Sequence, residues 1–187
     1  WSSSAASDVY KRQTYGAACG PAIDEVPNNN LIILWGTNIV STHVHMVPFV
    51  EEAKKKGAKI ICIDPRETRT AALCDWHIQP KPGTDAALAL GMMHLIVKNR
   101  KHDLAFLKKH TTGHEGFIKN ILPKYSPDKV SRITGLKKEI IMQLAKEYAA
   151  TKKTYIRPNY GLNRHRNGGM MVLSLIHISE PTRQSLI

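Results

Sequence analysis

Small polar residues and a glycine follow an apolar run in the segment LIILWGTNIVSTH, residues 31–43. The run stops at Gly36, and four hydroxyl or amide side chains come soon after it: Thr37, Asn38, Ser41 and Thr42. A small residue lets phosphate oxygens approach the backbone, and free N–H groups at the start of a following helix bind anions. The pattern predicts a phosphate-binding turn. The alternative is that Gly36 only turns the chain and Asn38 makes a turn hydrogen bond.

Two acidic residues occupy comparable places further along the chain. Asp64 follows the apolar run KIICI at 59–63, and Asp85 follows Gly83 and Thr84 at the start of an apolar helical pattern. A carboxylate can accept hydrogen bonds from ribose hydroxyls or from the N–H edge of guanine. The three loops together predict a site for a nucleotide-bearing cofactor. The alternative is that both carboxylates cap loops or helices. No G-x-G-x-x-G fingerprint occurs, which disfavours an ordinary NAD site.

The elements that must position these loops form a βαβ unit. The near-continuous apolar runs at 31–35 and 59–63 are typical of strands buried on both faces of a parallel sheet. Between them we expect a helix that is capped by Ser41 or Thr42 and ends near Lys56. In open α/β sheets, ligands bind outside the carboxyl ends of the strands. The predicted fold class is α/β, a Rossmann-like parallel sheet flanked by helices, within a larger multidomain enzyme.

Further elements are expected downstream. We expect a short strand in WHIQ, a buried helix that begins near Asp85, and a new strand at TYIRP. Three more helices are expected in DLAFLKKH, SPDKVSRITG and LKKEIIMQLAKEYAAT. In the last of these, Ile140, Leu144 and Tyr148 should share one apolar stripe.

Composition narrows the function classes. The net charge of +12 implies an anionic partner, but the cations are spread in short runs typical of solvated helix faces, so we do not expect nucleic acid binding. No apolar run approaches the roughly 20 residues of a bilayer span, so no direct membrane span is expected. The three cysteines, Cys19, Cys62 and Cys74, form no C-x-x-C pair, which argues against a disulfide framework or a self-contained zinc site. We expect Cys62 to be a core residue.

Four ordered segments resemble the molybdopterin oxidoreductase family, which includes formate dehydrogenases and nitrate, thiosulfate and dimethyl sulfoxide reductases. They are TYGAACGPAIDEVPNNN, LIILWGTNIVSTH, EEAKKKGAKIICIDPRETRTAALCDWHIQPKPGTDAALALGMMHLI and YGLNRHRNGG, and the resemblance covers about residues 14–172. It implies a fragment of the catalytic subunit of an oxidoreductase. The implied cofactor is bis-molybdopterin guanine dinucleotide with molybdenum or tungsten, which carries the redox chemistry.

The resemblance also implies which loop meets which part of the cofactor. The loop from Trp35 to Thr42 would lie against the phosphates, Asp64 to Thr68 against the guanosine, and Gly83 to Asp85 against the guanine end. Tyr160 to Arg164 would approach the pterin nearest the metal. The implied cofactor contacts are Trp35, Gly36, Thr37, Asn38, Ser41, Thr42, Asp64, Pro65, Arg66, Thr68, Gly83, Thr84, Asp85, Tyr160, Gly161 and Arg164.

One of these positions departs from the family pattern. Many relatives carry Gln where this chain has Arg164. The arginine would either add a cation near the metal, or it would bond the pterin or a nearby carboxylate. His165 beside it is a further candidate contact with cofactor or substrate. No catalytic residue and no metal ligand can be named from the sequence.

We expect an internal fragment of a longer protein. Residues 14–150 would form the cofactor-binding domain and 151–172 the start of the next cofactor-contacting segment, while 1–13 and 173–187 resemble translated sequencing adapter. The family's iron–sulfur motif, which binds a 4Fe–4S cluster, would lie upstream. The expected partners are the remaining domains of the same polypeptide, an iron–sulfur electron-transfer subunit and a small-molecule substrate. The parent protein would lie in the cytoplasm or the periplasm. The alternative function is a non-catalytic nucleotide-binding module, favoured if the isolated chain binds free guanine nucleotide tightly.

Overall fold

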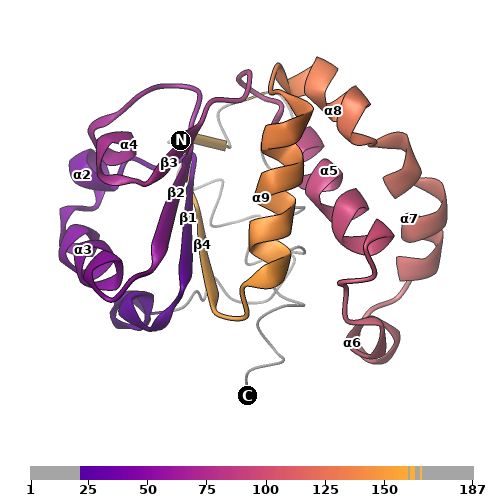
Figure 1. The fold of residues 1–187 in the computed structure, drawn as a ribbon, viewed down its shortest axis with the longest axis horizontal. Helices are drawn as coiled ribbons and strands as arrows, with labels where there is room; N and C mark the ends of the chain where they lie inside the picture. Colours follow the sequence, from indigo (N-terminus) through magenta and orange to yellow (C-terminus); the bar gives the residue numbers. More distant parts are fainter. Residues whose placement is uncertain (1–21, 160, 163–164, 166–187) are drawn as a thin grey trace, which may run out of the picture. The chain divides into compact units, whose positions relative to one another are not determined.

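The computed structural model describes residues 22–159, 161–162 and 165 (Figure 1). The described residues divide into two compact units. The first contains residues 22–79 together with the described residues between 153 and 165, and it holds the sheet. The second contains residues 80–152, whose regular elements are all helical. No helix in this described part of the chain is long and apolar enough to cross a membrane.

The sheet of the first unit is parallel throughout its described strands, in the order β3-β2-β1-β4 (Figure 1). The strands are β1 (Leu31–Trp35), β2 (Lys59–Ile63), β3 (Trp76–Ile78) and β4 (Thr154–Pro158). All residues of β1 are buried, as expected for a strand covered on both faces. The predicted α/β fold with a parallel sheet is confirmed, and so are the strands expected in LIILW, KIICI, WHIQ and TYIRP.

Three helices lie on one face of this sheet: α2 (Ile39–Thr42), α3 (Val47–Lys55) and α4 (Arg69–Leu73) (Figure 1). Short 3-10 segments, η1 (Ile23–Asn28) and η2 (Val44–Met46), complete the layer. Their apolar side chains and those of the strands form one buried cluster: Val26, Ile32, Leu34, Ile39, Met46, Val50, Ala53, Ala58, Ile60 and Tyr155. Burial of this cluster fixes the sheet against its helices.

The helix after β1 begins later than predicted. Neither Ser41 nor Thr42 caps a long helix; α2 ends at Thr42, η2 follows, and α3 starts only at Val47. Pro48 supplies the reason, because it has no N–H and is tolerated in the first turn of a helix but not in its interior. The expected end near Lys56 is correct, since α3 closes at Lys55.

The second unit consists of α5 (Asp85–Lys98), α6 (Leu104–His110), α7 (His114–Asn120), η3 (Leu122–Lys124), α8 (Pro127–Thr134) and α9 (Lys138–Ala150). Helix α5 packs against α8 and α9, and its apolar residues form much of the buried core of the unit. The stripe predicted on α9 is shifted by one position at its start: Ile141, not Ile140, is buried together with Leu144 and Tyr148. The helices α4 and α7 were not expected from the sequence.

Candidate functional site

The turn after β1 is held by backbone contacts with the end of β2 and with the segment after β4. Gly36 has a left-handed φ of +59°, its N–H donates to the Ile63 carbonyl (N···O 2.8 Å), and its own carbonyl accepts from the Gly161 N–H (3.2 Å). A Cβ on Gly36 would lie 3.0 Å from Cγ of Leu162. The glycine is therefore required by its φ and by this packing. The predicted reason, close approach of a phosphate to Gly36, is not needed to explain it.

The backbone just beyond Gly36 is the part suited to bind an anion. Thr37 is buried at 2% exposure, and its Oγ1 accepts from the Asn159 amide (3.0 Å). Within the described part of the chain, the N–H groups of Thr37, Asn38 and Ile39 have no acceptor. Unpaired buried N–H groups are rare in folded proteins, and an anion would satisfy them. The helix dipole adds little here, because α2 has only four residues.

The side chain of Asn38 is tied to a neighbouring loop. Its Oδ1 accepts a hydrogen bond from the Thr70 hydroxyl (2.8 Å), and Thr70 Oγ1 in turn accepts from the Val40 N–H (3.2 Å). Thr42 donates its hydroxyl to the Asn38 carbonyl (2.9 Å), and Ser41 is exposed. Of the polar side chains predicted at this turn, those of Thr37, Asn38 and Thr42 thus have intramolecular partners.

The second predicted loop leaves β2 at the same edge of the sheet. Asp64 Oδ1 accepts from the Arg66 N–H (2.9 Å), and the Asp64 carbonyl accepts from His77 Nε2 (2.9 Å). Thr68 caps α4, because its Oγ1 accepts from the Ala71 N–H (3.3 Å). Pro65 and Arg66 are exposed. Since parallel strands end at one edge, the turns after Trp35 and Ile63 lie next to each other.

The remaining predicted residues fall elsewhere. Gly83 (φ +77°), Thr84 and Asp85 belong to the second unit, where Thr84 donates to the Lys81 carbonyl (2.6 Å) and Asp85 is buried at the first position of α5. Gly161 lies against Gly36, so the structure brings this one residue of the fourth predicted loop to the first loop. Tyr160 and Arg164 lie outside the described residues. The prediction that they contact the cofactor therefore remains a prediction.

Arg157, which also lies in the first unit, was not singled out from the sequence. Arg157 of β4 pairs in register with Leu34 of β1, and its Nη2 makes a long contact of 3.5 Å with His43 Nδ1. Arginine only donates, so His43 Nδ1 would be the acceptor of this contact. The signal that could have found Arg157 is a cation within an otherwise apolar strand, since such a residue needs a partner.

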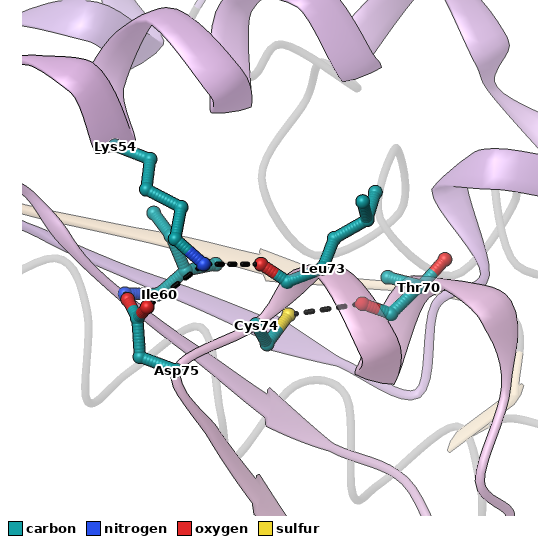
Figure 2. A network of polar contacts seen from close by, with 6 residues as sticks. All are labelled: Lys54, Ile60, Thr70, Leu73, Cys74 and Asp75. Carbon is teal, nitrogen blue, oxygen red and sulfur yellow. Dashed lines mark hydrogen bonds and ion pairs between the residues drawn. The ribbon is translucent and has the colours of Figure 1, made fainter.

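A polar network holds the short helix α4 in place (Figure 2). Lys54 Nζ donates to the Leu73 carbonyl (2.8 Å) and pairs with Asp75 Oδ1 (2.8 Å), while Asp75 Oδ2 accepts from the Ile60 N–H (2.8 Å). Burial alone would raise the pKa of Asp75, but the hydrogen bonds from Lys54 and Ile60 and the charges of Lys54 and Lys59 lower it below its usual value. The carboxylate is thus held ionised where α4 meets β2.

Neither described cysteine is arranged for chemistry. Cys62 is fully buried, and contact with the Cys74 thiol, together with burial, raises the pKa of the Cys62 thiol well above its ordinary value. Cys74 donates to the Thr70 carbonyl (3.1 Å; Figure 2). Among the described residues, no group of three or more His, Cys, Asp or Glu side chains could hold a metal ion.

Comparison with known proteins decides the family. The family model described as molybdopterin oxidoreductase matches residues 2–184. The chain belongs to the molybdopterin oxidoreductase family. Membership implies a molybdopterin cofactor with molybdenum or tungsten. The matched range includes most of both terminal segments, 1–13 and 173–187, and their interpretation as adapter sequence stays a prediction.

Several relatives are similar over most of this chain. A probable oxidoreductase, YoaE of Bacillus subtilis, is 44% identical over 98% of this chain and 27% of its own length. Formate dehydrogenase H of Escherichia coli is 36% identical over 87% of this chain and 22% of its own length. The chain thus spans about a quarter of these relatives. The solved structure of acetylene hydratase from Pelobacter acetylenicus matches with a TM-score of 0.82 at 23% identity, covering 95% of this chain and 24% of that one, which supports the fold.

Proposed function

We propose that this chain is the part of a molybdenum or tungsten oxidoreductase that holds the guanine dinucleotide portion of its cofactor. The carboxyl edge of the sheet, formed by the turns Trp35–Thr42 and Asp64–Thr68, would bind the dinucleotide. The observation that carries the proposal is the row of backbone N–H groups at Thr37, Asn38 and Ile39, which have no acceptor within the described residues.

The donor set of this edge fits a phosphorylated guanosine. The free N–H groups suit pyrophosphate oxygens, and exposed Arg66 of the second loop and Arg69 at the start of α4 would add positive charge to this edge. Asp64 keeps one carboxylate oxygen on the Arg66 N–H and can offer the other to ribose hydroxyls or guanine N–H groups. The bound cofactor would supply the two-electron or oxygen-atom transfer chemistry, and these residues would orient it.

Other parts of the cofactor would be held by residues that the described edge does not include. We propose that Gly83, Thr84 and Asp85 recognise the guanine end, and that Tyr160, Gly161 and Arg164 approach the pterin nearest the metal. The catalytic subunit as a whole would carry a 4Fe–4S cluster and pass electrons to an iron–sulfur subunit. The isolated chain should show no turnover, because it covers about a quarter of its relatives.

The test uses the full-length parent protein, produced in a host that makes molybdopterin cofactors. Metal would be measured by mass spectrometry, and GMP would be measured after mild acid hydrolysis. The proposal predicts molybdenum or tungsten, with GMP in the twofold excess over metal that a bis-guanine dinucleotide requires. Protein that contains neither metal nor guanine would overturn it.

A matched pair of variants assigns the site. Asp64→Asn keeps a carbonyl oxygen for the Arg66 N–H but loses the negative charge, so GMP retention should fall about tenfold, the loss of one charge-assisted hydrogen bond. Asp24→Asn, an exposed acid in η1, is the control and should retain wild-type GMP. Equal retention in both variants would move the guanosine site away from Asp64.

The alternative is a non-catalytic module that binds a free guanine nucleotide at the same edge. It predicts tight binding of GDP by the isolated chain and no metal in the parent protein. The cofactor-holding function predicts the reverse, because most of the contacts would come from domains outside this chain.

A further inference from the structure

Thr70 lies between the two loops of the proposed cofactor edge. It is fully buried, and its hydroxyl makes two hydrogen bonds to the first loop: it donates to Asn38 Oδ1 (2.8 Å) and accepts from the Val40 N–H (3.2 Å). Thr70 itself belongs to α4, which follows directly on the second loop, Asp64–Thr68. One buried hydroxyl therefore joins both loops.

The position of Thr70 is fixed from its own side. Helix α4 has five residues, too few to be stable alone, and three contacts hold it. Thr68 caps its start. Figure 2 shows the other two contacts, in which Lys54 donates to the Leu73 carbonyl and the Cys74 thiol donates to the carbonyl of Thr70. The hydroxyl is thus presented to Asn38 by a firmly anchored segment.

The hydrogen bond to Thr70 changes what Asn38 does. Asn38 stands at the N-cap position of α2, where an asparagine side chain ordinarily accepts from an N–H of the first helical turn. No such cap bond forms here, and Thr70 Oγ1 instead takes the Val40 N–H. Thr70 thus takes over the Val40 N–H that an Asn38 cap would meet, and it fixes the Asn38 side chain beside the N–H groups of Thr37, Asn38 and Ile39.

We propose that Thr70 is a positioning residue that holds the turn after β1 in place for the cofactor phosphates and locks it to the guanosine loop. This role rests on the proposed function. Without the Thr70 hydroxyl, Asn38 Oδ1 would lose its donor and the Val40 N–H its acceptor, so the turn would no longer be held to α4. Thr70 would not touch the reacting atoms.

The first experiment needs no cofactor. Hydrogen exchange of residues 37–43 would be measured by mass spectrometry in the 187-residue chain, as wild type, Thr70→Val and Thr70→Ser. We expect Thr70→Val to speed exchange of this segment about tenfold, as for loss of one hydrogen bond, and Thr70→Ser to restore it. Asn38→Ala breaks the same bond from the other partner and should also speed exchange.

Thr134→Val is the matched control. Thr134 is equally buried, and its hydroxyl also donates to a carbonyl (Val130, 2.8 Å) and accepts an N–H (Leu136, 3.2 Å), but it belongs to the second unit. It should leave exchange of residues 37–43 unchanged. Equal exchange of this segment in Thr70→Val and Thr134→Val would overturn the proposal.

The second experiment measures GMP in the full-length protein carrying the same substitutions. Thr70→Val should lower GMP per protein about tenfold, while Thr70→Ser and Thr134→Val should retain it. If wild-type protein holds GMP and Thr70→Val holds as much, the positioning role is wrong and the proposed function stands. Wild-type protein without GMP would overturn the proposed function and this role with it.

Discussion

Gly161 approaches Gly36 so closely that a Cβ on Gly161 would lie 2.6 Å from the Gly36 carbonyl oxygen. That oxygen accepts the Gly161 N–H, and the Asn159 N–H donates to the Trp35 carbonyl just before it (3.1 Å). The two segments are far apart in the sequence, and their backbones meet at the carboxyl edge of the sheet. No side chain fits between them.

We predict that Gly161→Ala destabilises the first unit. The added methyl would meet backbone, which can yield only by shifting a whole turn, so the free energy of unfolding should fall by about 1–3 kcal/mol. Urea denaturation of the wild-type and variant chains measures this. The control is Gly116→Ala in α7, where the nearest atom is the flexible Asn120 amide at 4.0 Å, and it should be neutral or slightly stabilising. Equal stability of the two variants would contradict the contact.

We predict that Asp75→Asn removes a pH-dependent part of the stability. The pKa of Asp75 is lowered in the folded chain, so its contribution is present above the unfolded pKa of 3.8 and is lost as pH falls through the folded value. Because the Lys54 and Asp75 side chains are 45% and 34% exposed, we expect about 1 kcal/mol or less at neutral pH. Denaturation curves between pH 2 and roughly 7 would follow it.

The control for Asp75 is Asp128→Asn. Asp128 pairs with Lys138 at 3.5 Å with both side chains largely exposed, so its loss should change stability by only a few tenths of a kcal/mol. The network of Figure 2 does not anchor α4 if Asp75→Asn lowers the free energy of unfolding no more than Asp128→Asn does, and if its stability falls at acid pH as in the wild type.

We predict that Gly91→Ala destabilises the second unit through α8. A Cβ on Gly91 would lie 2.9 Å from Cγ2 of Val130, a buried side chain without room to move. The free energy of unfolding should fall by about 1–3 kcal/mol, although alanine favours a helix. The double variant Gly91→Ala with Val130→Ala should be less destabilised than the sum of the two single changes. Strict additivity would show that the two residues do not touch.

We predict that the thiol of Cys62 is inert in the folded chain. Its pKa is raised by the Cys74 thiol and by burial, so it stays protonated at pH values where an unfolded cysteine ionises. Because the pKa of Cys62 is higher in the folded chain than in the unfolded chain, the free energy of unfolding should fall as the pH rises above the pKa of the unfolded thiol. Iodoacetamide labelling with peptide mapping should modify Cys62 only after unfolding. Rapid native-state labelling of Cys62 would refute this.

Much of the sheet could be predicted from the sequence. The runs LIILW and KIICI are apolar at every or nearly every position, and only a strand covered on both faces buries such a run within five residues. The helix that begins at Asp85 could be predicted for a similar reason, because its apolar residues nearly encircle it. The predicted start of α3 is wrong because Pro48, which is tolerated only in the first turn of a helix, moves that start beyond Ser41 and Thr42.

The finer structure of the site could not be predicted, because it depends on contacts between distant residues. Thr70 is 32 positions from Asn38, and nothing in either local sequence points to their hydrogen bond. Gly36 was interpreted through a ligand, whereas Gly161 and Leu162 account for it through packing. Gly83 to Asp85 lie in the second unit, so their part in the cofactor site remains a prediction.

The most direct test is a crystal structure of the full-length protein with its cofactor. The account predicts that pyrophosphate oxygens accept hydrogen bonds from the N–H groups of Thr37, Asn38 or Ile39, and that the Asp64 carboxylate contacts the guanosine. A structure in which those N–H groups meet another protein segment, with the dinucleotide bound elsewhere, would contradict it.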